Sequence, residues 1–247
     1  MPFGTFQDGG LKYNNPVRPG IREVKRIWEE GNCDLVTSIG TGFQTQPSSP
    51  RAPNFRNLFQ DGALSRLYRA SMSSLSLSGE NSWNDHFHGL EQDTRENHFR
   101  LDLPLDYEPK LDEVDKMSQL EDLTRSNLGE LDSIARAIKA ASFFFELDLP
   151  IADRGQLYMC SGTILSRSPN SQALVENILA EFPHARFVDQ YNTPLGSLTT
   201  ADICEACGRY QICVDFKVHH PNQLVSIELE FSKLYQRKIS SFPRLME

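Results

Sequence analysis

Asp8 is the residue of this chain whose type and surroundings best suit acid–base chemistry. The segment from Phe3 to Phe6 resembles the end of a strand, and Asp8-Gly9-Gly10 has the composition of a tight turn after it. A carboxylate on such a turn is held rigidly, because the glycines permit positive φ angles and close backbone packing. In that position Asp8 can accept a proton from a nearby serine hydroxyl. The plainer alternative is an Asx turn at the entrance to a helix.

A helix and then a strand are expected to follow this turn and to position it. Asn14-Asn15-Pro16 favours a helix start, because Asn caps free N–H groups and Pro suits the first helical turn. Apolar residues then recur at helical spacing up to Gly31; they are Val17, Ile21, Val24 and Trp28. Residues 34–39 form a short strand, and Gly40-Thr41-Gly42 is the turn that ends it. Helix followed by strand with short connections predicts an α/β arrangement.

The run from Phe6 to Gly42 resembles the aspartate-loop region of patatin-like phospholipases. In that family Asp-Gly-Gly or Asp-Gly-Ala comes before Asn-Asn-Pro at a helix start, and the likeness here continues to the Gly-Thr-Gly turn. The resemblance implies that Asp8 is the general base of a Ser–Asp dyad that hydrolyses acyl lipids, with Gly9 and Gly10 shaping its loop. It also implies that residues 1–45 are the C-terminal remnant of a three-layer patatin-type domain.

The serine of such a dyad has no counterpart in this sequence. The family carries it in G-x-S-x-G, and a G-x-G-x-x-G loop forms the oxyanion hole; neither pattern occurs here, and only seven residues precede Asp8. Loss of a serine nucleophile costs on the order of 10⁶ in turnover. We therefore expect part of a phospholipase or lysophospholipase that is inactive alone. The alternative is a non-catalytic binding or regulatory module with a vestigial aspartate loop.

Two acidic segments are better explained as solvated helix faces. Asp61-Gly62-Ala63 matches the Asp-Gly-Ala form of the aspartate-loop motif, but the surrounding sequence is helical and no Asn-Asn-Pro follows it. Residues 112–122 lack the glycine and the closing glutamate of a calcium loop. We expect neither segment to carry chemistry.

The histidine pairs are expected to be solvated surface residues. His86 and His88 lie two positions apart, a spacing that suits a strand better than one face of a helix. His219 and His220 fall in a predicted turn. No third ligand at metal spacing accompanies either pair, so a metal site is not predicted for them.

The five cysteines favour reduced thiols, because their number is odd and no secretion signal is recognisable. Cys204 and Cys207 have the C-x-x-C spacing of a zinc half-site, and Cys160 and Cys213 are further possible ligands. A second close pair is missing, however. Reduced structural thiols are therefore favoured over a metal site, and no cofactor is predicted.

The secondary structure of the remaining chain is predicted from the periodicity of apolar residues and from residues that favour turns. A weaker likeness to the region after the patatin domain of large fungal patatin-like proteins covers residues 67–75, 99–101, 142–147, 203–207 and 237–243 and assigns no chemistry. In the first part of this region we expect a loop at 44–54, helices at 55–68 and 83–97, and an edge strand at 98–103 that stops at Pro104. We then expect a helix at 112–125 and another from 131 that ends near Pro150. A strand at 155–166, a helix capped by Asn170 or Ser171, and a β-hairpin pairing 212–218 with 225–231 complete the prediction. The expected fold is thus an α/β remnant (1–45), a mainly helical region (46–150) and an α+β region with a β-hairpin (151–247).

Composition narrows the class of protein further. Of 247 residues, 39% are hydrophobic and 23% charged, which is typical of a folded globular chain. The formal net charge of −8 disfavours nucleic acid as a partner. No apolar run approaches the ~20 residues of a transmembrane helix, and the N-terminus lacks a signal-peptide pattern. We expect a cytoplasmic protein whose partner is an acyl lipid substrate, provided that a serine-bearing half is present.

Overall fold

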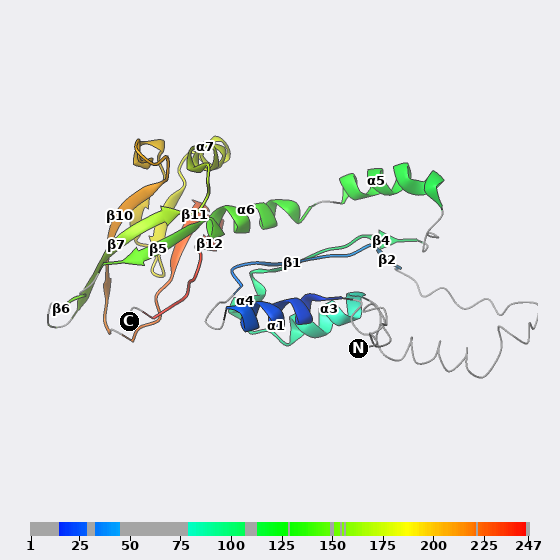
Figure 1. Cartoon of the computed structure of the whole chain (residues 1–247), viewed down its shortest axis with the longest axis horizontal. Coiled ribbons are helices and arrows are strands. Elements are labelled where there is room, and N and C mark those ends of the chain that lie inside the picture. The colour runs from blue at the N-terminus through cyan, green and yellow to red at the C-terminus, as the bar shows by residue number, and fades with distance from the viewer. Residues whose placement is uncertain are drawn as a thin grey trace, which may run out of the picture. The chain divides into compact units, whose positions relative to one another are not determined.

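The protein is a mixed α/β chain with two compact units, Met1–Leu131 (unit 1) and Asp132–Glu247 (unit 2) (Figure 1). The computed structural model describes residues 15–28, 33–44, 79–106, 113–127, 129–148, 151–153, 155, 157–220 and 222–245. Within these ranges it contains six α-helices and several small sheets. The mixture of helices and strands expected from the sequence is confirmed at this level.

The described strands of unit 1 form parallel pairs. β1 (Val36–Ile39) pairs with β3 (His98–Leu101), so that Ser38 lies opposite Arg100. β2 (Phe43–Gln44) pairs with β4 (Pro104–Leu105) in the same direction. The predicted strands at 34–39 and 98–103 are therefore present in shortened form. β3 ends at Leu101, before Pro104. Pro104 begins the separate strand β4, where its missing N–H is tolerated at the first strand position.

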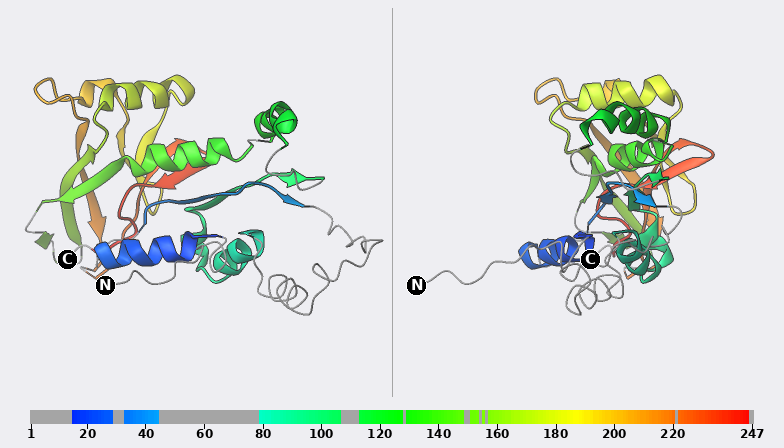
Figure 2. Two further views of the ribbon diagram at one scale, coloured as in Figure 1. Left: turned by 45° about the vertical axis from the view of Figure 1, so that its right-hand side comes forward. Right: turned by 90° about the vertical axis from the view of Figure 1, so that its right-hand side faces the viewer.

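Helices cover one face of the β1–β3 pair (Figures 1 and 2). These are α1 (Val17–Ile27) and α3 (Gly79–His88), and α4 (Gln92–Arg95) follows α3 along the chain.

A 3₁₀ turn (Val114–Lys116) leads into α5 (Met117–Ser126). The predicted helix start is present, but Pro16 is the N-cap of α1 and not part of its first turn. Lys25 and Arg26 in the last turn suit the negative end of the helix dipole. The predicted helix at 83–97 is two helices, and the helix expected from 112 begins at Met117.

Several predicted features of unit 1 lie outside the described residues. They include Asp8, Gly9, Gly10, the helix end at Gly31, most of the loop at 44–54, the helix at 55–68 and Asp61. These remain predictions.

Unit 2 contains two antiparallel four-stranded sheets. One has the order β10-β7-β5, with β6 also paired to β7, and the other has the order β12-β11-β8-β9. The strands are β5 (Phe143–Leu147), β6 (Ala152–Asp153), β7 (Tyr158–Ser166), β8 (Arg186–Asp189), β9 (Pro194–Ser197), β10 (Gln211–Val218), β11 (Ile227–Ser232) and β12 (Tyr235–Lys238). Two helices, α6 (Leu131–Ala141) and α7 (Ser171–Glu181), are connected by an ion pair between Lys139 and Glu181 (3.0 Å).

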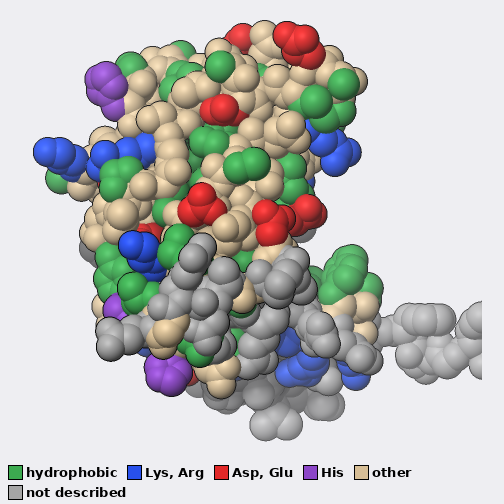
Figure 3. All heavy atoms as spheres, turned by 90° about the vertical axis from the view of Figure 1, so that its left-hand side faces the viewer, with side chains coloured by type: hydrophobic (Ala, Val, Ile, Leu, Met, Phe, Trp, Pro, Cys, Tyr) green, Lys and Arg blue, Asp and Glu red, His purple; other side chains and the backbone are tan. Residues whose placement is uncertain are grey.

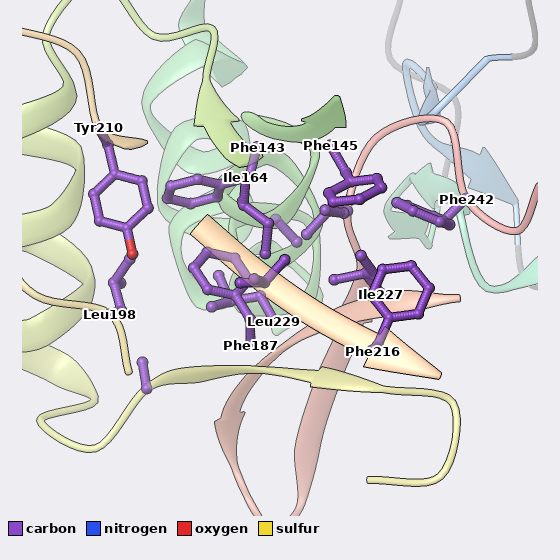
Figure 4. Packing of buried hydrophobic residues seen from close by; sticks show 14 of the residues in the cluster. Phe143, Phe145, Ile164, Phe187, Leu198, Tyr210, Phe216, Ile227, Leu229 and Phe242 are labelled. Carbon is purple, nitrogen blue, oxygen red and sulfur yellow. The ribbon is translucent and has the colours of Figure 1, made fainter. Parts of the chain in front are cut away.

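The core of unit 2 is apolar and rich in aromatic rings (Figure 4). Phe143 contacts both Phe187 and Tyr210 edge-on, with ring centroids 5.3 and 5.5 Å apart. All three side chains are fully buried, as are Ile164 and Leu229. Edge-to-face contacts between buried rings add to the stabilisation that burial of the apolar surface provides. The alternation of apolar and polar residues in β10 follows from this core, because every second side chain points into it.

The predicted hairpin is wrong in its pairing, although both of its strands exist. β10 pairs with β7, from Gln211 opposite Leu165 to Val218 opposite Tyr158, while β11 pairs with β8 and β12. Periodicity reveals which face of a strand is buried but does not name its neighbour. Here the two strands belong to different sheets, and the hairpins of this region are β8–β9 and β11–β12 instead.

The helix predicted from 131 to near Pro150 is also wrong at its end. α6 stops at Ala141, and Phe143 and Phe145 lie in β5, which pairs with β7. Phe145 falls at helical spacing from Ala141, but three consecutive Phe residues favour a strand. The helix after Asn170 is confirmed: the Asn170 side chain accepts a hydrogen bond from the Ala173 N–H (3.0 Å), and α7 begins at Ser171.

Candidate functional site

The predicted catalytic residues Asp8, Gly9 and Gly10 lie outside the described residues, and the described part of the aspartate-loop region begins at Asn15. Asn15 belongs to a chain of hydrogen bonds that crosses unit 1. We call this set the Asn15–Asp102 network; its side chains are Asn15, Ser38, Arg100 and Asp102. It fixes the start of α1 against the strands.

Asn15 joins three elements through one buried side chain, which is 7% exposed. Its Oδ1 accepts the Val17 N–H (3.1 Å) at the start of α1. Its Nδ2 donates to Ser38 Oγ in β1 (3.1 Å) and to the Gly79 carbonyl at the start of α3 (3.2 Å). The sequence predicted an Asn cap here. In the structure the N-cap is Pro16, and Asn15, one residue before it, accepts the Val17 N–H and anchors the helix start to β1 and α3.

Arg100 and Asp102 complete the network from β3 and the residues after it. Arg100 donates to Ser38 Oγ through Nη1 and to Asp102 Oδ2 through Nη2. Asp102 Oδ1 also accepts the backbone N–H groups of Gly42 (2.8 Å) and Leu103 (3.0 Å). The side chains of this ion pair are only 15% and 7% exposed, so each charge depends on the other.

The Gly40-Thr41-Gly42 turn is shaped by this carboxylate. A Cβ at Gly40 would lie 2.1 Å from Asp102 Oδ2, a distance that no side chain tolerates. Gly42 has a φ of +104°, which favours glycine. The turn that the sequence suggested after β1 thus requires glycine for two different reasons.

The network positions elements and does not supply a nucleophile. Ser38 Oγ has Asn15 and Arg100 as its hydrogen-bond partners among the described residues, and neither is a base. Asp102 is engaged by Arg100 and by two backbone N–H groups instead. Without a base on its hydroxyl, Ser38 is not activated for attack on an ester.

Sequence reasoning missed Arg100 and Asp102 as partners. The predicted strand at 98–103 places them on one face, because residues two apart in a strand point to the same side. An opposite-charge pair at that spacing, in a strand whose other face is apolar, was the available signal. The contact between Arg100 and Ser38 cannot be predicted from residue spacing, because β1 and β3 meet only in the folded chain.

His86 is buried, which corrects the expectation of a solvated surface residue. It lies in α3, is 8% exposed, and its ring is 5.3 Å from that of His98 and 5.7 Å from that of Trp83. Burial, followed by the nearby His98 and Arg18, lowers the pKa of His86. Burial also lowers the pKa of His98, against a hydrogen bond between His98 Nδ1 and the Thr94 carbonyl (2.8 Å). His88, on the other side of α3, is exposed as expected.

Cys204 and Cys207 lie together on a tight turn of unit 2. The Gly208 N–H donates to the Cys204 carbonyl (2.8 Å). Hydrogen bonding from Cys207 and from the Ala206 backbone lowers the pKa of Cys204. Cys207 is exposed and Cys204 is partly exposed, whereas Cys160 is buried in the core. All five cysteines are free thiols. In the described parts of the chain, no three His, Cys, Asp or Glu side chains gather in a way that could hold a metal.

Unit 2 also carries a shallow hollow of about 420 Å³ beside the end of α7. Phe182 and Phe231 form part of its lining, and Arg186 and Glu230 lie on its wall. Arg186 Nε donates to Glu230 Oε1 (3.0 Å), and Gln236 Nε2 donates to Glu230 Oε2 (3.1 Å). These charged groups satisfy one another, and the lining also contains His184, Ser232 and Lys233.

Comparison with known proteins does not assign a family. A scan against models of protein families finds no match, and searches of curated proteins and of solved structures find none either. Among the described helices, none combines the length and the apolar character that are needed to cross a membrane.

Proposed function

We propose that this chain supplies the aspartate-bearing part of a patatin-like acyl hydrolase site, with Asp8 as the general base of a Ser–Asp dyad. The serine and the oxyanion loop come from polypeptide outside this sequence, because neither G-x-S-x-G nor G-x-G-x-x-G occurs in it. The substrate class is an acyl ester of a lipid. The chain alone is then inactive.

The anchoring of α1 by Asn15 is the observation that carries this proposal. A dyad aspartate must be held within hydrogen-bond reach of its serine, so the element that follows it has to be fixed. Asn15 is buried and bonded to β1, α1 and α3, and it belongs to the Asn-Asn-Pro motif that follows the Asp8 turn. A surface helix with an ordinary cap needs none of these contacts beyond the cap itself.

The exposed side of the β1–β3 pair gives further support. Parallel sheets are normally covered on both faces. In unit 1, α1 and α3 lie on one face (Figure 2), whereas Ile39 of β1 is 76% exposed. Among the described strands only β3 pairs with β1. A three-layer domain completed by the serine-bearing polypeptide would cover this apolar side chain.

The experiment begins with the purified chain and a fluorophosphonate probe, which labels activated serines. We expect no labelling; stoichiometric labelling would overturn the proposal. The transcript upstream of Met1 is then read, and the joined protein is expressed if it contains the serine motifs. In this protein Asp8→Asn is expected to lower acyl-ester hydrolysis by about 10⁴-fold, as loss of a catalytic aspartate does in serine hydrolases.

Asp61→Asn is the matched control, since Asp61-Gly62-Ala63 is nearly identical to Asp8-Gly9-Gly10 but is not followed by Asn-Asn-Pro. Full activity is expected for this variant. Equal activity of the two variants would exclude Asp8 as the base. An upstream sequence without either serine motif would favour the alternative, a non-catalytic module.

A further inference from the structure

The exposed side of α1 is basic. The helix contains four basic residues and one acidic residue, and all of these side chains are exposed. Arg18, Arg22 and Lys25 recur at intervals of four and three, a spacing that places them on one side of a helix. The fourth cation, Arg26, is paired with Glu23 (3.0 Å). α1 therefore presents an excess of positive charge to the solvent.

Apolar side chains are exposed where this helix ends. Ile27 is 65% exposed, and the C-cap residue Trp28 is 60% exposed. The earlier apolar residues Ile21 and Val24 are half-buried, and α1 lies along one face of the β1–β3 pair (Figures 1 and 2). Trp28 follows Val24 by four positions, so it extends the apolar side of α1 beyond the part that the rest of unit 1 covers.

This combination of exposed groups indicates the chemistry of a partner. Basic side chains next to an exposed tryptophan and isoleucine are typical of helices that lie in the interface of a membrane. The indole ring of Trp28 suits the headgroup region, because its body is apolar and its N–H is polar. A nucleic acid would neutralise the same cations, but it offers no apolar environment for Ile27.

We propose that α1 docks unit 1 onto a membrane that contains acidic lipids. Arg18, Arg22 and Lys25 lie against the acidic headgroups, and Ile27 and Trp28 insert among them. The inference deepens the proposed function and rests on it in one respect, namely that the acyl lipid substrate is located in such a membrane. The docking surface itself consists only of α1 and its C-cap.

The formal net charge of −8 does not prevent this contact. Charges farther apart than the Debye length, about 8 Å at physiological ionic strength, are largely screened, so the groups nearest the membrane decide the attraction. Over the upper part of the face in Figure 3, acidic side chains lie among basic and hydrophobic ones, and such a mixed surface is not comparably basic. Glu29 and Glu30 follow Trp28 in the sequence and reduce the local excess of positive charge. We therefore expect binding that is reversible and that weakens as salt is added.

The test uses the full purified chain and vesicles of phosphatidylcholine mixed with phosphatidylserine. Sedimentation measures the bound fraction, and tryptophan fluorescence reports the environment of Trp28. We expect binding to these vesicles, about tenfold weaker binding to pure phosphatidylcholine vesicles, and a blue shift of the emission on binding. Trp28→Phe keeps an apolar ring and should still bind, but without the shift, because Trp83 is already buried in the free chain.

Lys25→Glu is expected to weaken binding to the acidic vesicles about 25-fold. Each elementary charge near such a membrane changes the affinity roughly fivefold, and the substitution changes two. Lys217→Glu makes the same change of charge at an exposed position of β10 in unit 2 and is the matched control. It should bind as the unchanged chain does, and circular dichroism verifies the fold of all the variants.

Four outcomes would overturn the docking proposal. They are no binding to the acidic vesicles, equal binding to pure phosphatidylcholine, equal loss in the Lys25 and Lys217 variants, and tighter binding to duplex DNA than to vesicles. Because vesicle binding requires no serine nucleophile, this result is separate from that of the acyl-hydrolase proposal. Docking by a chain whose upstream sequence lacks the serine motifs would support the membrane contact and exclude the hydrolase, and hydrolysis without docking would do the reverse.

Discussion

The two units of this protein are stabilised in different ways. In unit 2, two antiparallel sheets enclose a continuous apolar core with several fully buried aromatic rings. In unit 1, the buried apolar side chains among the described residues are Trp83, Phe99 and Leu105, and α1 has no fully buried residue. Among the described residues of unit 1, the Asn15–Asp102 network, a chain of polar and charged groups, connects α1 and α3 to the strands.

This difference matters because apolar and polar interactions respond differently to change. Burial of apolar surface is non-directional and tolerates small shifts, whereas a buried ion pair is costly to break from one side. A unit held by such a network has a well-defined geometry but little reserve of stability. That combination suits a segment that positions a functional loop, whereas unit 2 has the core of a self-sufficient fold.

Phe187→Ala is expected to give the largest effect, a loss of about 3–5 kcal/mol in the stability of unit 2. Phe187 is fully buried against Phe143, so that its removal leaves a cavity in the aromatic core. Hydrogen exchange of peptides from β7 and β11 measures the change. Leu234→Ala, at a position that is 85% exposed, is the control and should leave this exchange unaltered. Similar exchange in the two variants would show that the core does not stabilise unit 2.

Asp102→Ala is expected to cost unit 1 about 3 kcal/mol, the lower end of the range for breaking a buried ion pair. The change leaves the Arg100 guanidinium without its carboxylate and removes the acceptor for the Gly42 N–H. Trp28 and Trp83 are the only tryptophans and both lie in unit 1, so fluorescence during urea unfolding reports on that unit. Asp106→Ala, at an exposed position, should change stability by less than about 0.5 kcal/mol. Coincident unfolding curves for the two variants would contradict the role of the network.

Tyr210→Phe is expected to stabilise unit 2 by about 1 kcal/mol, because an unpaired buried hydroxyl costs roughly 1–3 kcal/mol. Tyr210 is fully buried, and its hydroxyl has no hydrogen-bond partner among the described residues. Burial and the nearby Asp202 raise the pKa of this phenol, in agreement with a site that disfavours its charged form. Thermal unfolding of the variant checks the sign. Tyr235→Phe, which alters a half-exposed ring, should have almost no effect; a loss of stability in the Tyr210 variant would reveal a partner for the hydroxyl.

The pH dependence of unit 1 is expected to be the smallest of the four effects. Burial lowers the pKa values of His86 and His98 below 6.5 in the folded chain, so the unfolded chain binds more protons at mildly acidic pH. The stability of unit 1 should therefore be fully present above pH 6.5 and fall as the pH drops below it. Tryptophan fluorescence in urea at pH 7 and pH 5.5 measures the change.

His86→Leu should make this dependence shallower, because one of the two buried imidazoles with a lowered pKa is gone. His88→Leu is the matched control, two positions along the same helix but exposed. An equal slope in both variants would mean that other groups cause the acid sensitivity.

Local features were predicted well wherever neighbours in the chain decide them. The cap at Asn170, the start of α1 after Asn-Asn-Pro and the strands around 36–39 and 158–166 follow from capping chemistry and alternation over a few residues. The candidate site was predictable only in part. Asn15 was singled out as a cap, but its bonds to Ser38 and Gly79 join positions 23 and 64 residues away.

The sequence by itself determined the α/β character of the chain, the composition of its turns and the absence of both serine motifs. Tertiary structure alone decided that β10 pairs with β7 rather than β11, that His86 is buried, and that Arg100 reaches both Ser38 and Asp102. The physical reason is that periodicity tells which face of an element avoids water but does not specify what covers it. The covering neighbours are selected by packing and by the pairing of buried polar groups across the whole unit.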